Sequence, residues 1–83
     1  MAINVQFTGT LNPGASNVWF VWGLARNTFY SWSARPQTPN SKVAITYQAV
    51  EQAADQSLTY WFRVANEGPQ PATFEMDYEF TNF

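Results

Sequence analysis

The feature that most constrains this chain is an alternation of apolar and polar residues with period two, repeated in six segments. The segments are residues 3–8, 18–25, 28–34, 42–50, 57–65 and 72–81. Such alternation is typical of β-strands with one buried face, and Gly, Pro and Asn residues separate the segments. The sequence therefore predicts an all-β fold, a small antiparallel β-sandwich of about six strands, either immunoglobulin-like or jelly-roll-like, formed by residues 1–83 as one domain.

The stability of such a domain must come from its core or from an oligomer interface. A chain of 83 residues has room for one small core, and without cysteine it can form no disulfide. Charged residues make up only 12% of the chain, so Asn, Gln, Ser and Thr must supply most of its polar surface.

Charge and hydropathy exclude two classes of partner. The net charge is −2, and the cations Arg26, Arg35, Lys42 and Arg63 are scattered, so we expect no nucleic-acid partner. No apolar stretch reaches the length of a membrane span, and the first residues lack the pattern of a signal peptide. We therefore expect no membrane span, and a location that is cytoplasmic or reached by non-classical export.

Enzymatic activity is not expected. The chain lacks histidine and cysteine, which removes the commonest general base, the thiolate nucleophile and most transition-metal ligands. We accordingly predict no metal and no cofactor. Glu75, Asp77 and Glu79 alternate on one strand face at about 6.6 to 7 Å, which overlaps the carboxyl spacing of inverting glycosidases. An acidic row is also typical of the solvated face of an amphipathic strand, so a hydrolase is the least favoured class.

Aromatic residues make up 18% of the chain, and strand phase decides which of them are buried. The predicted core consists of Val5, Phe7, Val18, Phe20, Trp22, Leu24, Tyr30, Trp32, Val43, Ile45, Tyr47, Leu58, Tyr60, Phe62, Val64, Phe74, Met76, Tyr78 and Phe80. The large rings of Trp19, Phe29 and Trp61 then remain on outer faces.

The segment of residues 17–23, NVWFVWG, carries large apolar side chains on both faces. We expect residues 18–25 to form a hairpin with residues 28–34 through a three-residue loop, because that register turns Ser31 and Ser33 outward. Trp19 and Val21 then lie together on an outer face. They are the predicted contacts of a homo-oligomer, since a small apolar chain can stabilise itself by burying such a patch against a copy of itself.

A second predicted hairpin, between residues 57–65 and 72–81, brings together a candidate ligand site. This pairing places Trp61 opposite Asp77, and Arg63 opposite Glu75. An indole stacks on the apolar face of a sugar, while charged groups bind its hydroxyls. The predicted ligand-binding residues are Trp61, Asp77, Arg63 and Glu79. Alternatively, Arg63 and Glu75 form an ordinary surface ion pair and Trp61 merely shields the sheet.

Two functions follow from the outer aromatic residues. The first is a non-enzymatic, lectin-like module that binds a glycan and forms a homo-oligomer, because weak single sites gain strength by multivalency. The alternative is a structural or assembly protein in which the same aromatic residues are subunit contacts. A ligand site leaves its tryptophans accessible to water, whereas a subunit contact buries them.

Overall fold

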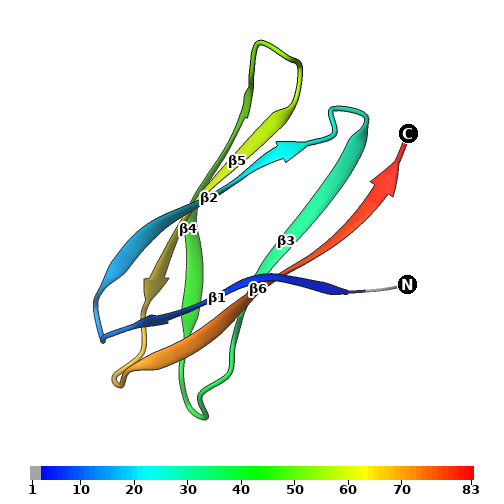
Figure 1. The fold of residues 1–83 in the computed structure, drawn as a ribbon. Helices are drawn as coiled ribbons and strands as arrows, with labels where there is room; N and C mark the ends of the chain where they lie inside the picture. The colour runs from blue at the N-terminus through cyan, green and yellow to red at the C-terminus, as the bar shows by residue number, and fades with distance from the viewer. Residues whose placement is uncertain (1–2) are drawn as a thin grey trace.

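The computed structural model describes residues 3–83, which form six β-strands and no helix (Figure 1). The strands are β1 (Asn4–Leu11), β2 (Ser16–Leu24), β3 (Thr28–Pro36), β4 (Val43–Gln52), β5 (Leu58–Asn66) and β6 (Ala72–Asn82). Each strand overlaps one of the predicted segments, so the all-β prediction is confirmed. Within residues 3–83 there is accordingly no long apolar helix that could cross a membrane.

The strands form two three-stranded antiparallel sheets that pack face to face as a small β-sandwich (Figure 1). We name them after their central strands: the β6 sheet has the order β1-β6-β3, and the β5 sheet has the order β2-β5-β4. The first strand pairs with the last, and the second with the fifth. This nested order resembles a jelly roll and differs from the immunoglobulin order, in which the first two strands share a sheet.

The two predicted hairpins are wrong. β2 and β3 lie in different sheets, and so do β5 and β6, so their connections cross between the layers. The β4–β5 connection joins neighbours within one sheet. An alternating strand can pair with any other strand of the same pattern, and a short connection can either close a hairpin or step between layers. Alternation alone therefore did not determine the partners.

The β5–β6 connection is held by the buried side chain of Asn66. Its Nδ2 atom donates hydrogen bonds to the carbonyl oxygens of Leu11, at 3.0 Å, and Gln70, at 2.8 Å. Its Oδ1 atom accepts a hydrogen bond from the backbone N–H of Gly68 at 2.9 Å. One buried amide thus ties the end of β1 to the loop that crosses between the sheets.

The core lies between the sheets and is built mainly from the two central strands. Its buried apolar residues are Leu11, Val21, Tyr60, Phe62, Val64, Phe74 and Met76. Trp19 extends this core, with its ring 5.7 Å from that of Phe7 and edge-on to Phe74 at 5.2 Å. The space there is so tight that a Cβ atom at Gly9 would lie 2.9 Å from the Phe74 ring.

The predicted phase of β2 is inverted. Val21 is 7% exposed and Trp19 packs into the core, whereas Phe20 and Trp22 are 55% and 74% exposed. The register of β2 against β5 shifts between Val21 and Leu24, where Gly23 has a φ of 73°. This β-bulge inserts an extra residue, so Leu24 faces the core in phase with Trp19 rather than with Trp22.

Other residues of the predicted core are also exposed. They are Val5, Val18, Tyr47 and Phe80, in addition to Phe20 and Trp22. Bulges explain Val5 and Tyr47, because the register of β1 shifts between Val5 and Phe7 and that of β4 between Ile45 and Tyr47. Phe80 is 49% exposed near the end of β6, beyond the last residue that β1 pairs.

Candidate functional site

The outer face of the β5 sheet exposes a group of aromatic and apolar side chains. Residues opposite one another in antiparallel strands point to the same side, so the pairs Phe20–Trp61 and Arg63–Tyr47 share one surface. We call this surface the aromatic face; the strand registers place Val18, Phe20, Tyr47, Ala49, Glu51, Trp61 and Arg63 on it. Trp22, which is exposed and two residues beyond Phe20, is included in it. Val18, Phe20, Tyr47 and Trp22 are between 43% and 74% exposed. Exposed apolar side chains grouped in this way make the aromatic face a candidate interaction surface.

The orientation of the Trp61 ring is fixed by two contacts. Its indole Nε1–H donates a hydrogen bond to Oε1 of Glu51 at 3.1 Å. The Phe20 ring lies 5.1 Å away at a tilt of 33°. The hydrogen bond and the ring contact restrain rotation of the Trp61 side chain, so the plane of its indole has a defined orientation.

Arg63 lies on the same strand as Trp61 and beside Tyr47. Its Cζ atom is 6.0 Å from the centre of the Tyr47 ring, which is within cation–π range. An open hollow of about 480 Å³ lies here. Its lining residues are Val18, Tyr47, Ala49, Glu51, Trp61 and Arg63. The hollow therefore combines aromatic planes with one acid and one base.

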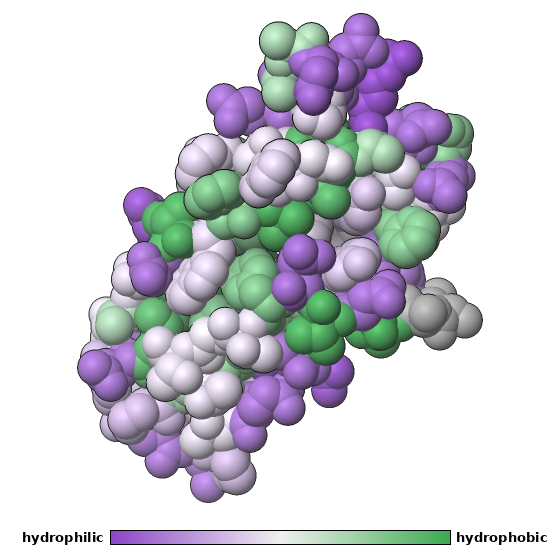
Figure 2. Space-filling view, in the orientation of Figure 1, coloured by the Kyte–Doolittle hydropathy of each residue, from purple (hydrophilic) through white to green (hydrophobic). Residues whose placement is uncertain are grey.

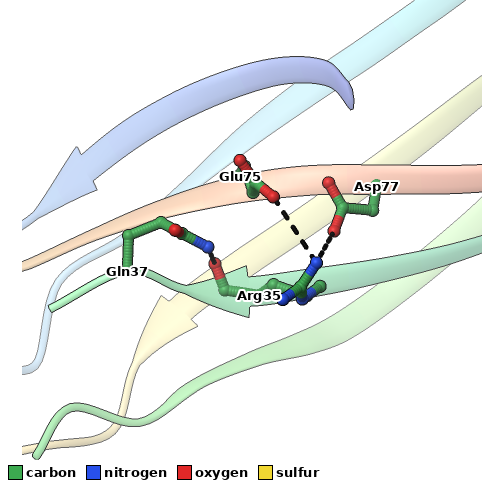
Figure 3. A network of polar contacts seen from close by, with 4 residues as sticks. All are labelled: Arg35, Gln37, Glu75 and Asp77. Carbon is green, nitrogen blue, oxygen red and sulfur yellow. Dashed lines mark hydrogen bonds and ion pairs between the residues drawn. The ribbon is translucent and has the colours of Figure 1, made fainter. Parts of the chain in front are cut away.

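The outer face of the β6 sheet has a different chemistry. The Nη1 atom of Arg35 lies 3.0 Å from Oδ2 of Asp77 and 3.7 Å from Oε1 of Glu75 (Figure 3). The Asp77 side chain is only 4% exposed, and its Oδ1 atom has no hydrogen-bond partner among the described residues. Glu79 and Ser33 line a smaller hollow of about 260 Å³ beside Asp77. We call this surface the acidic face.

The predicted ligand site is divided between these two outer faces. Trp61 and Arg63 lie on the aromatic face, whereas Asp77 and Glu79 lie on the acidic face, on the other side of the sandwich. The predicted opposition of Trp61 to Asp77 is wrong, because it depended on a β5–β6 hairpin that does not form. The carboxylate beside Trp61 is instead Glu51, from β4.

The predicted oligomer contacts, Trp19 and Val21, face the core rather than the solvent. The exposed apolar residues of β2 are Val18, Phe20 and Trp22, on the opposite side of the strand. β2 thus has an outer apolar patch, as expected, but it is made by the other set of side chains. The inversion follows from the bulge at Gly23.

The prediction missed Phe20, Trp22, Tyr47 and Glu51 as neighbours of Trp61. A signal for part of this was present, because an isolated glycine within a strand pattern often marks a bulge, and Gly23 is such a residue. Nothing in the sequence pattern indicated that β4 would bring Glu51 to Trp61. That contact depends on which strands share a sheet.

A third hollow, of about 670 Å³, opens among the loops at one end of the sandwich. Asp55 lies here, where the hydroxyl and backbone N–H of Ser57 donate hydrogen bonds to its Oδ1 atom at 2.6 and 3.0 Å. These bonds lower the pKa of the Asp55 carboxyl below its ordinary value. Because Asp55 already accepts two hydrogen bonds from Ser57, its carboxylate has less hydrogen-bonding capacity left for a ligand. This hollow is therefore a weaker candidate site than the aromatic face.

No group of His, Cys, Asp or Glu side chains within residues 3–83 is arranged to hold a metal ion. Elsewhere in the sandwich, burial raises the pKa of the Tyr60 hydroxyl, which faces the core. The aromatic face is the strongest candidate for a binding site, because it combines exposed aromatic rings with the charged groups of Glu51 and Arg63. Figure 2 shows one side of the molecule, on which hydrophobic residues are exposed around the middle with hydrophilic residues among them and at both ends.

The chain matches no protein-family model, and no curated protein or solved structure is significantly similar to it.

Proposed function

We propose that this protein is a non-enzymatic binding module that binds carbohydrate on its aromatic face. The observation that carries the proposal is the fixed, outward indole of Trp61, with Glu51 and Arg63 on the same surface. The face lies on a sheet, so its side chains are placed by paired strands rather than by mobile loops.

The chemistry of the aromatic face suits a sugar. The apolar C–H face of a pyranose can stack on the Trp61 indole, and Phe20 and Tyr47 extend the apolar surface on either side. Sugar hydroxyls can donate to the Glu51 carboxylate and accept from the Arg63 guanidinium. A few convergent polar groups among aromatic side chains are the usual composition of a small-molecule site.

An assembly role for the same surface is the second candidate. Val18, Phe20 and Trp22 are exposed in alternation on an edge strand, and a second copy of the chain packed there would bury them. Such packing would also bury Arg63, which costs free energy unless the second copy supplies an anion. We therefore favour the glycan.

Iodide quenching distinguishes the two candidates. If the aromatic face is free to bind a glycan, iodide should quench the fluorescence of Trp22, measured as the difference between the parent and Trp22→Phe. If the face is a subunit contact, iodide should not quench the Trp22 contribution at protein concentrations at which the protein sediments as an oligomer.

The proposal predicts that Trp61→Ala weakens glycan binding about 5- to 30-fold, because it removes a stacking contact worth about 1 to 2 kcal/mol. The glycan is the one that the parent binds most tightly on a glycan array, and calorimetric titration measures its affinity. The matched control is Phe29→Ala, which removes a ring that is 63% exposed on the opposite outer face and should leave the affinity unchanged.

Both variants should keep the fold, since neither ring belongs to the buried core. The proposal fails if the parent binds no glycan on the array. It also fails if Trp61→Ala, shown to be folded by circular dichroism, binds as tightly as the parent.

A further inference from the structure

Arg63 is a cation without an ionic partner in the described part of the chain. The ion pairs among residues 3–83 join Arg35 to Glu75 and Asp77, and Lys42 to Glu67. The Arg63 guanidinium takes part in none of them and donates no hydrogen bond within these residues. Its five N–H donors are therefore available to a ligand.

The position of Arg63 is unusual for an unpaired charge. It lies on β5, the central strand of its sheet, directly between Val18 of β2 and Tyr47 of β4. The charge thus stands within the aromatic face rather than at its rim. The cation–π contact with Tyr47 restrains the guanidinium and leaves its N–H groups free. A planar guanidinium matches the geometry of a carboxylate or a sulfate with two parallel hydrogen bonds.

The two ends of the aromatic face along β5 carry opposite charges. Arg63 lies opposite Tyr47 at one end, Trp61 is in the middle, and Glu51 lies opposite Thr59 at the other end. Thr59 and Arg63 are four residues apart, or about 13 Å along a strand. In the order of the strand, Trp61 therefore lies between Arg63 and the residue opposite Glu51, and the Glu51 carboxylate, which accepts a hydrogen bond from the Trp61 Nε1–H, can also accept from sugar hydroxyl groups.

The other carboxylates of the sandwich act weakly at Arg63. Glu75, Asp77 and Glu79 lie on the acidic face, on the far side of the sandwich. Glu67 forms an ion pair with Lys42, and Asp55 lies in the β4–β5 connection, where it accepts hydrogen bonds from Ser57. Packed sheets are about 10 Å apart, and at physiological ionic strength exposed charges are screened over about 8 Å. The net charge of −2 therefore does not prevent an anionic group from binding at Arg63.

We propose that the glycan bound by the aromatic face is acidic, with a carboxylate or sulfate on the sugar next to the one that stacks on Trp61. This inference rests on the proposed function and adds the role of Arg63. The guanidinium binds the anionic group beside Tyr47, while Trp61 and Glu51 hold the neighbouring, uncharged sugar.

The test uses glycans in matched pairs. Hyaluronan oligosaccharides carry only carboxylates, and carboxyl reduction makes them neutral. Keratan sulfate oligosaccharides carry only sulfates, and desulfation makes them neutral. The array also carries other glycans with uronate or sulfate groups, each with its neutral counterpart. Comparing the pairs shows whether the anion that Arg63 binds is a carboxylate or a sulfate.

We expect the parent to bind at least one acidic glycan ten or more times more tightly than its neutral counterpart. Arg63→Gln should remove this preference, so that the variant binds the acidic glycan and its neutral counterpart with affinities within a factor of two of one another. Arg63→Lys keeps the charge but loses the planar fork, so it should retain part of the preference. Arg26→Gln, which removes the same charge from the β2–β3 turn, should bind as the parent does.

Two results would overturn the inference and leave the proposed function standing. One is a parent that binds neutral glycans as tightly as their acidic counterparts. The other is a folded Arg63→Gln variant that keeps the full preference for the acidic member. A parent that binds no glycan at all would overturn the proposed function itself, and this inference with it.

Discussion

Trp19→Ala should lower the free energy of unfolding by about 3 to 5 kcal/mol, the usual cost of truncating a large aromatic core residue. Trp19 stacks on Phe7 and meets Phe74 edge-on, so its loss leaves a cavity between the sheets. The matched control is Phe20→Ala, one residue along the same strand but on the outer face, which should cost less than about 1.5 kcal/mol. Urea denaturation measures both.

This comparison tests the phase of β2 directly. The cost expected for Trp19→Ala is comparable with the total stability of a small chain, which is several kcal/mol. Trp19→Phe, which leaves a smaller cavity, is therefore measured beside it. If Phe20→Ala proved the more destabilising variant, Val18, Phe20 and Trp22 would be the core residues and the assignment of the aromatic face would be wrong.

Asn66→Ala should cost about 3 kcal/mol or more. It removes hydrogen bonds to the carbonyl oxygens of Leu11 and Gln70 and from the N–H of Gly68, and it leaves buried polar groups without partners. The control is Asn12→Ala, the same change at an exposed position in the β1–β2 connection, which should cost less than about 1 kcal/mol. Thermal and urea denaturation give both values, and equal losses would contradict the role of Asn66.

The success of the sequence-based prediction differed between central and edge strands. In the central strands β5 and β6, Phe62, Val64, Phe74 and Met76 are buried as predicted, because a strand paired on both sides keeps a regular alternation. Three of the four edge strands, β1, β2 and β4, carry the bulges, whereas β3 pairs with β6 without a register shift. Bulges concentrate at sheet edges, and each one reverses the faces of the residues that follow it.

The candidate site could be predicted only in part. The outward positions of Trp61 and Arg63 follow from the regular alternation of β5. Their neighbours Glu51 and Phe20 come from strands distant in the sequence, and the nested strand order decides which strands those are. Local patterns do not contain that order, so Asp77 was assigned to a face on which it does not lie.

The most direct test of glycan binding on the aromatic face is a nuclear magnetic resonance titration of the ¹⁵N-labelled protein with the tightest glycan from the array. The chain has four tryptophans, and each gives one indole N–H signal. We predict that the signals of Trp61 and Trp22 shift most, together with the backbone amides around Arg63, while those of Trp19 and Trp32, which are partly buried and pack against the core, change little. Shifts that gather instead around Asp77 on the acidic face, or that leave the Trp61 indole unchanged at saturation, would contradict the account.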